Sequence, residues 1–111
     1  MTLRDLYKIL LEAGIPVGHY ETQQEKCPYI IYQEGGSSYK WASGQTVRED
    51  TKVGAEHYTT DEFDPSLDAL KVALLKNKIP FTVSSTEFDP TEKVIVSIFN
   101  ITISREMEVE P

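Results

Sequence analysis

The feature that most constrains the fold is a long run of branched and aromatic residues, VIVSIFNITIS, over 94–104. Such residues favour β-strands, and about eleven residues is roughly twice the common strand length. Its apolar alternation changes phase near Ile98, as Val96 precedes it on one face and Phe99 begins the other. A β-bulge near Ile98 or a strand buried in mid-sheet would explain this change. The run therefore predicts a sheet, and a strand this long can also pair outside its own domain.

The first helix is predicted from the N-terminal segment 2–13, which repeats apolar residues at the i, i+3, i+4, i+7 spacing of one helical face. Thr2 and Asp5 have the spacing of a capping box, which satisfies backbone N–H groups in the first turn. Gly14 occupies the usual position just after a helix, and Pro16 prevents the helix from resuming. This helix is long enough to cover one face of a small sheet.

A second helix is predicted from Asp64 to about Asn77. Asp64 is a favourable N-cap, and Pro65 suits the first helical position because that position needs no N–H donor. A strand over 81–86 follows, and a turn at 89–92 leads into the long C-terminal strand.

The central part of the chain reads as three strands joined by polar links. The first, over 29–33, is apolar on both sides of its pleat, which is typical of a strand covered on both faces. Two glycines and two serines over 35–38 predict a turn, after which 39–42 returns as a second strand. A flexible polar loop over about 43–50 then leads to a third strand over 51–60.

The order α-β-β-β-α-β-β predicts an α+β fold, in which two amphipathic helices pack on a mostly antiparallel sheet of about five strands. The length of 111 residues fits a single domain over 1–111 with one core. An acidic tail over about 105–111 is expected to be frayed.

The composition indicates an ordinary soluble globular protein, with 40% hydrophobic and 26% charged residues. No apolar run approaches the length of a transmembrane helix, and the amphipathic N-terminus lacks the apolar stretch of a signal peptide. Cys27 is the only cysteine, so an internal disulfide and a thiolate metal site are both excluded. We therefore expect a reducing cytosol and no association with a membrane.

The charge balance disfavours a nucleic-acid-binding protein. Eleven basic residues against 18 acidic ones give a formal net charge of −7, and the basic residues form no cluster. Binding to phosphates depends on such clusters. A negatively charged wall would instead repel DNA and let it pass without sticking.

No pattern in the chain predicts catalysis, so we expect a protein that is not an enzyme and that holds no cofactor or metal. The chain lacks phosphate-binding glycine motifs, a nucleophile elbow and the usual spacings of metal ligands. His57 precedes Asp61, Glu62 and Asp64, which could in principle collect a metal. The simpler interpretation is a partly exposed histidine on a strand, followed by acids that cap a helix.

The remaining candidates are surfaces that bind a partner. Tyr39 and Trp41 share one strand face, and aromatic residues of this kind anchor many interfaces. Alternatively, both pack on the protein's own helices as cross-strand aromatics. Arg48 is the third interface candidate and lies in the predicted loop over 43–50, which could be an arm ordered on binding or simply a mobile loop.

Several short signatures in this order resemble a known family. They are GIPV at 14–17, PYIIY at 28–32, HYTT at 57–60, DEFDP at 61–65, LDALKVALL at 67–75 and KIPF at 78–81. The arrangement resembles the small tail-completion proteins of long-tailed bacteriophages and prophages, also called tail terminators or head–tail joining proteins. The resemblance extends from Leu3 to about Ser104 and depends on element order and short apolar signatures.

The resemblance implies a virion structural protein that forms a homo-oligomeric ring, typically a hexamer, where the tail tube meets the head connector. Such a ring ends tube growth and offers the surface on which the head docks. Its partners would be other copies of itself, the tail tube protein and the head connector or stopper protein, with DNA as a non-specific passenger in the lumen. Its location would be the tail–head junction of the virion, and the host cytoplasm during assembly.

Two other classes of protein stay open. One is a monomeric protein-binding adaptor that uses the hairpin carrying Tyr39 and Trp41 on a single partner. The other is a small enzyme or ligand-binding domain with a pocket between helix and sheet. Self-association distinguishes the ring from the adaptor, and stabilisation by a ligand would indicate the third class.

Overall fold

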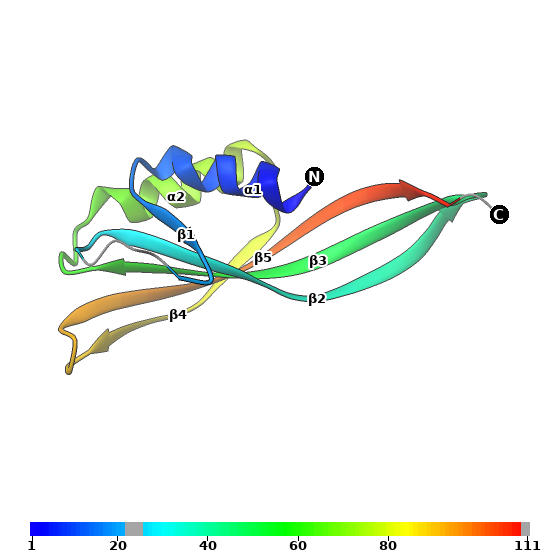
Figure 1. The fold of residues 1–111 in the computed structure, drawn as a ribbon. Coiled ribbons are helices and arrows are strands. Elements are labelled where there is room, and N and C mark those ends of the chain that lie inside the picture. The colour runs from blue at the N-terminus through cyan, green and yellow to red at the C-terminus, as the bar shows by residue number, and fades with distance from the viewer. Residues whose placement is uncertain (22–25, 110–111) are drawn as a thin grey trace.

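The computed structural model describes residues 1–21 and 26–109, in which two α-helices lie on one face of a five-stranded sheet (Figure 1). In chain order the elements are α1 (Leu3–Leu10), a 3-10 turn η1 (Leu11–Ala13), β1 (Val17–His19), β2 (Tyr29–Ser43), β3 (Thr46–Thr59), α2 (Pro65–Lys76), β4 (Phe81–Asp89) and β5 (Val94–Glu108). The strands lie in the order β1-β2-β3-β5-β4, and only the β1–β2 pair is parallel. The predicted α+β class and element order are confirmed.

Both helices begin where the local signals place them. The side chain of Thr2 accepts from the Asp5 backbone N–H, and the Asp5 carboxylate accepts from the Thr2 N–H, which completes the capping box. Asp64 caps α2 by accepting from the Ser66 N–H at 2.8 Å. Gly14 ends the first helical segment with φ +78°, a left-handed conformation that glycine adopts at little cost.

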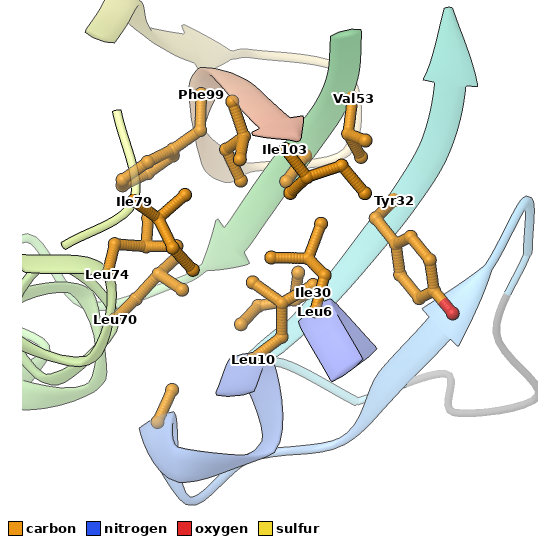
Figure 2. Close-up of a cluster of buried hydrophobic side chains, with 13 residues drawn as sticks. Leu6, Leu10, Ile30, Tyr32, Val53, Leu70, Leu74, Ile79, Phe99 and Ile103 are labelled. Carbon is orange, nitrogen blue, oxygen red and sulfur yellow. The ribbon is translucent and has the colours of Figure 1, made fainter. Parts of the chain in front are cut away.

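The core lies between the helices and the facing side of the sheet (Figure 2). One side comes from the apolar faces of α1 and α2, and the other from alternate residues of β2, β3 and β5. The fully buried members are Leu6, Leu10, Ile30, Val53, Ala55, Leu70, Leu74, Phe99 and Ile101. Where the helices cover the sheet, alternation turns every second residue of β2, β3 and β5 toward them.

The predicted break at 35–38 is wrong, because β2 runs without interruption from Tyr29 to Ser43. Its partner β3 continues beside it, and the register shifts where Gly35 and Gly36 together oppose Lys52. Two residues opposite one define a β-bulge, which absorbs the glycines without reversing the chain.

The expected loop over 43–50 is also wrong. Gly44 and Gln45 alone form the turn, and β3 begins at Thr46. Gly44 supplies the positive φ of +48° that so short a turn requires. The segment is therefore the tip of a long β-hairpin, whose backbone hydrogen bonds to neighbouring strands hold it in place.

The expected frayed tail over 105–111 is paired for most of its length. Residues 105–108 belong to β5 and pair with β3, while 110–111 lie outside the described residues. The three-residue strand β1, which pairs with Ile30–Tyr32, was not predicted. A strand so short has no apolar period to reveal it.

The apolar phase change near Ile98 is not a break in β5, since a polar residue occupies one of its core-facing positions. Burial alternates along β5 without a break, because Ser97 occupies a core-facing position before Phe99. The irregularity lies in β4 between Val83 and Ser85, opposite Ile98 and Phe99. Of the two explanations that the sequence left open, the mid-sheet strand is the one confirmed, since β5 lies between β3 and β4.

Three strands extend well beyond the helices. We call this extension the arm: residues 37–51 of β2, the turn and β3, together with 104–108 of β5. Figure 1 shows it projecting from the helix-covered body, and the described residues measure 53 × 26 × 24 Å. The arm is therefore an exposed three-stranded sheet with two faces and two edges.

The two faces of α2 should respond differently to truncation. Leu70 is fully buried, whereas Leu75 on the same helix is 65% exposed. We expect Leu70→Ala to lower the free energy of unfolding by about 2–5 kcal/mol, because it leaves a cavity in the core. Leu75→Ala should change it by roughly 0.5 kcal/mol or less. Urea unfolding measures both, and equal losses would contradict the described packing.

Candidate interface on the extended arm

The bulge in β2 decides which side chains the arm presents on each face. Before the bulge, the even-numbered residues Ile30 and Tyr32 point toward the helices. The extra residue shifts the phase, so that Tyr39 and Trp41 lie on this same side of the sheet. A Cβ on Gly35 would lie 3.3 Å from the Lys52 carbonyl oxygen, so glycine suits this close approach.

One face of the arm is an apolar surface that no helix covers. Trp41, Val47 and Met107 lie side by side across β2, β3 and β5. Tyr39 lies beside this row, two residues along β2. The side chain of Trp41 is 68% exposed and that of Tyr39 is 59% exposed. We call these four residues the apolar face of the arm, and their exposure excludes the alternative that Tyr39 and Trp41 pack on the protein's own helices.

The charged residues beside the apolar face neutralise each other. Tyr39, Glu49 and Arg105 form the neighbouring row across the three strands. Arg105 Nε donates to Glu49 Oε1 at 2.6 Å, and the hydroxyl of Tyr39 donates to the same carboxylate. The hydrogen bond from Tyr39, followed by that from Arg105, lowers the pKa of Glu49. This row therefore adds hydrogen bonds to the face without adding net charge.

The opposite face of the arm is polar, and Arg48 lies on it. Arg48 Nε donates to Asp50 Oδ1 at 2.9 Å, and the Ser104 hydroxyl donates to the same carboxylate oxygen. The hydrogen bond from Ser104, followed by that from Arg48, lowers the pKa of Asp50. Lys40 and Glu106 flank Arg48 across the strands. The structure thus brings Tyr39 and Trp41 together and places Arg48 on the other side of the sheet.

Val47 and Met107 are interface candidates that the sequence did not reveal. Both belong to segments predicted as a loop or a frayed tail, where strand alternation was not expected. Once residues 46–50 and 105–108 are read as strands, period-2 alternation places both residues on the side of Trp41. The missing signals were the tight hairpin that returns β3 beside β2 and the pairing of β3 with the distant β5.

The outer edges of the arm are open in the described part of the chain. β1 pairs with β2 only as far as Tyr32, and β4 pairs only with the first half of β5. Beyond β4, the Met1 ammonium group donates to the Ser104 carbonyl at 2.7 Å. Within residues 1–21 and 26–109, no strand pairs with the outer edge of β2 over 33–43 or of β5 over 105–108. Open edges of this kind can pair with another chain.

His57 is fully buried, which corrects the expectation of a partly exposed strand histidine. Its Nε2 lies within hydrogen-bond distance of Ser66 Oγ, at 2.7 Å, and its Nδ1 has no partner among the described residues. The carboxylates of Asp64 and Asp61 accept backbone hydrogen bonds near the start of α2. Asp64 caps the helix, and Asp61 accepts from the Phe63 N–H. The contacts place His57 as a polar core residue that links β3 to α2.

The described residues contain no group of three or more His, Cys, Asp or Glu side chains placed to hold a metal ion. One hollow of about 580 Å³ lies beside the bulge and has no histidine or cysteine in its lining. Its only carboxylate, that of Glu34, is hydrogen-bonded to His19 and accepts from the Tyr20 hydroxyl at 2.9 Å. Cys27 is half-buried, and burial raises the pKa of its thiol, which disfavours the reactive thiolate.

The cluster around Glu34 ties the short strand β1 to the start of the bulge. The ring of His19 stacks between those of Tyr20 and Tyr32, with centroids 4.1 and 4.7 Å away. The hydrogen bond from His19 is the main cause that lowers the pKa of Glu34. These contacts hold Tyr20, the residue just after β1, against β2, where its backbone N–H also donates to the Tyr32 carbonyl at 2.9 Å.

Comparison with known proteins does not identify a family for this chain. No protein-family model matches the chain, and no curated protein matches it. Neither helix of the described chain has the length and apolar character needed to cross a membrane. The apolar face and the open edges of the arm are therefore the features from which a function can be inferred.

The burial of His57 predicts a measurable loss of stability in mild acid. Burial lowers the pKa of His57 below its usual 6.5, an effect that the Asp64 carboxylate partly opposes. Below about pH 6.5 the unfolded chain therefore binds more protons at this site than the folded one, and the free energy of unfolding falls until the folded pKa is reached.

Urea unfolding at several pH values between 7.5 and 5.5 measures this loss. The matched variant His57→Gln keeps a group that can hydrogen-bond to Ser66 but does not titrate in this range. We expect a smaller decrease in stability for the variant than for the wild-type chain. Identical pH dependence in the two proteins would show that His57 does not titrate differently on unfolding.

Proposed function

We propose that this chain is a structural protein of the phage tail-terminator kind, which assembles into a ring at the end of the tail tube and presents the surface where the head docks. The observation that carries the proposal is the arm, whose apolar face continues the helix-covered side of the sheet without any cover. Exposed Trp and Tyr side chains on a rigid element are typical anchors of protein interfaces.

The shape of the molecule supports an assembly of many copies. A closed ring requires two different surfaces on each copy, because one surface of each copy binds the other surface of the next copy. The arm projects from the body, and its tip is held by paired strands and by the hydrogen bond from the Val109 N–H to the Gln45 carbonyl at 2.8 Å. A preorganised arm loses little conformational entropy when it docks, which favours a stable contact.

The charge of the chain suits the passage of DNA through such a ring. The net charge is −7, and the loop before α2 carries three acidic residues, Asp61, Glu62 and Asp64. DNA would meet a wall that repels its phosphates and does not bind them. In this role DNA is a passenger, while the tail tube protein and the head connector protein are the specific partners.

Negative-stain electron microscopy of the purified chain, with and without isolated phage tail tubes, tests the proposal. We expect rings at high protein concentration, or caps on the ends of the tubes. A chain that remains monomeric and ignores the tubes at every concentration would contradict it. In that case the same arm would serve the alternative function, a monomeric adaptor that binds one protein partner.

The variant Trp41→Ala should separate assembly from folding. Because Trp41 is 68% exposed, its loss should change the free energy of unfolding by roughly 1 kcal/mol or less. Loss of an interface anchor of this kind weakens the binding free energy of each contact by about 2 kcal/mol or more, which is enough to abolish rings or caps. Light scattering, microscopy and urea unfolding together measure both effects.

Phe63→Ala provides the matched control, since Phe63 is an aromatic residue that is 83% exposed but lies far from the arm. We expect this variant to assemble as the wild-type chain does. If Trp41→Ala assembled normally, or if both substitutions disrupted assembly equally, the arm would not be the anchor.

A further inference from the structure

We propose that copies of this chain join head to tail through the edges of their arms, so that the outer edge of β2 in one copy pairs with the outer edge of β5 in the next. This inference rests on the proposed ring and specifies its contact. The partner is a second copy of the chain, and the contact forms by backbone hydrogen bonds between the two edge strands.

The directions of the strands make this pairing repeatable. β2 and β5 are both antiparallel to β3, so they run parallel to each other in one copy. A rotation that brings β5 of the next copy against β2 keeps these directions and yields a parallel pair. Each copy then uses its β2 edge once and its β5 edge once, which is the head-to-tail relation that closes a ring.

The charges on the two edges are complementary. Lys40 is the only charged residue over 38–43 of β2, and it is exposed. On β5, Glu106 and Glu108 are exposed, while Arg105 is already paired with Glu49. Neither Lys40 nor these two glutamates has an ion-pair partner in the described part of the chain. The β2 edge therefore carries an exposed positive charge and the β5 edge two exposed negative charges.

The register within one copy shows where these charges would meet. Lys40, Arg48 and Glu106 lie in one row across the arm, on the polar face. Continuing this row into the next copy places its Glu106 beside Lys40, and a stagger of two residues places Glu108 there. Either register forms an ion pair across the new edge.

The same charges disfavour pairing between identical edges. A two-fold contact between two β2 edges would bring one Lys40 toward the other. A two-fold contact between two β5 edges would bring Glu106 and Glu108 of one molecule toward the same two glutamates of the other. Like charges placed opposite each other destabilise strand pairs, so electrostatics select the head-to-tail contact over either two-fold contact.

The apolar face becomes continuous in this arrangement. Trp41 lies at the β2 edge and Met107 at the β5 edge of the row that they share with Val47. In a level register, Trp41 of one copy would contact Met107 of the next, and a thioether beside an aromatic ring is a favourable contact. The joined arms would thus form one sheet with an apolar side and a polar side.

Charge reversal at the two edges tests the proposal. Lys40→Glu alters the β2 edge, and the double variant Glu106→Lys/Glu108→Lys alters the β5 edge. We expect each to raise the concentration needed for assembly by about tenfold or more, as measured by analytical ultracentrifugation. A 1:1 mixture of the two proteins should assemble again, because every edge then meets an opposite charge. The triple variant should also assemble alone.

Two reversals in the turn between β4 and β5, at the other end of the molecule, serve as controls and should leave assembly unchanged. Lys93→Glu changes the net charge by the same step as Lys40→Glu, and Glu92→Lys changes it in the direction of the double variant by half as much. Thermal unfolding of each monomer verifies that all variants fold. Wild-type assembly that persists in both edge variants, or a mixture that fails to assemble, would overturn the edge pairing and leave the proposed ring intact. A wild-type chain that never assembles would overturn both.

Discussion

The pairing of β3 with β5 is the contact on which the rest of the structure depends. It joins 14 successive residue pairs, from Thr46 with Glu108 to Thr59 with Ile95, without a register shift. At one end this ladder contributes Ala55 and Phe99 to the core. At the other end it leaves the body and forms the centre of the arm. Because this ladder and the β2–β3 ladder pair the facing backbone N–H and C=O groups, three strands can extend away from the core and stay ordered.

The helices could be predicted from the sequence because their signals are local. Thr2 with Asp5, and Asp64 with Pro65, cap the chain within a single turn, and the apolar period then gives the length of each helix. The fold class followed from the order of the elements. The arm could not be predicted in this way, because Gly35 and Gly36 have the composition of a turn. Whether two glycines turn the chain or form a bulge depends on whether β3 continues beside them.

The candidate site was predicted in part. The tryptophan and the tyrosine were correctly expected to share a strand face, because two residues two apart on one strand always do. Val47 was missed because its segment was expected to be a loop and not a returning hairpin strand. Met107 was missed because its place in the row depends on pairing with Val47, which lies about 60 residues earlier in the sequence. Arg48 was a candidate because it lies in the segment predicted as a loop, and strand alternation places it on the face opposite to the aromatics. Surfaces that form across strands need the register, which composition does not contain.

The uninterrupted path of the strands from body to tip has a mechanical consequence. A force that pulls the arm along its length acts parallel to β3 and β5, and so loads their many cross-strand hydrogen bonds in shear at the same time. A bending force meets one weak point, the bulge at Gly35 and Gly36, but this point lies in β2 alone, while the other two strands pass it without a break. The arm can therefore transmit a displacement from its tip to the helices as a stiff rod does. A flexible loop of the same length would bend instead and would not pass the displacement on.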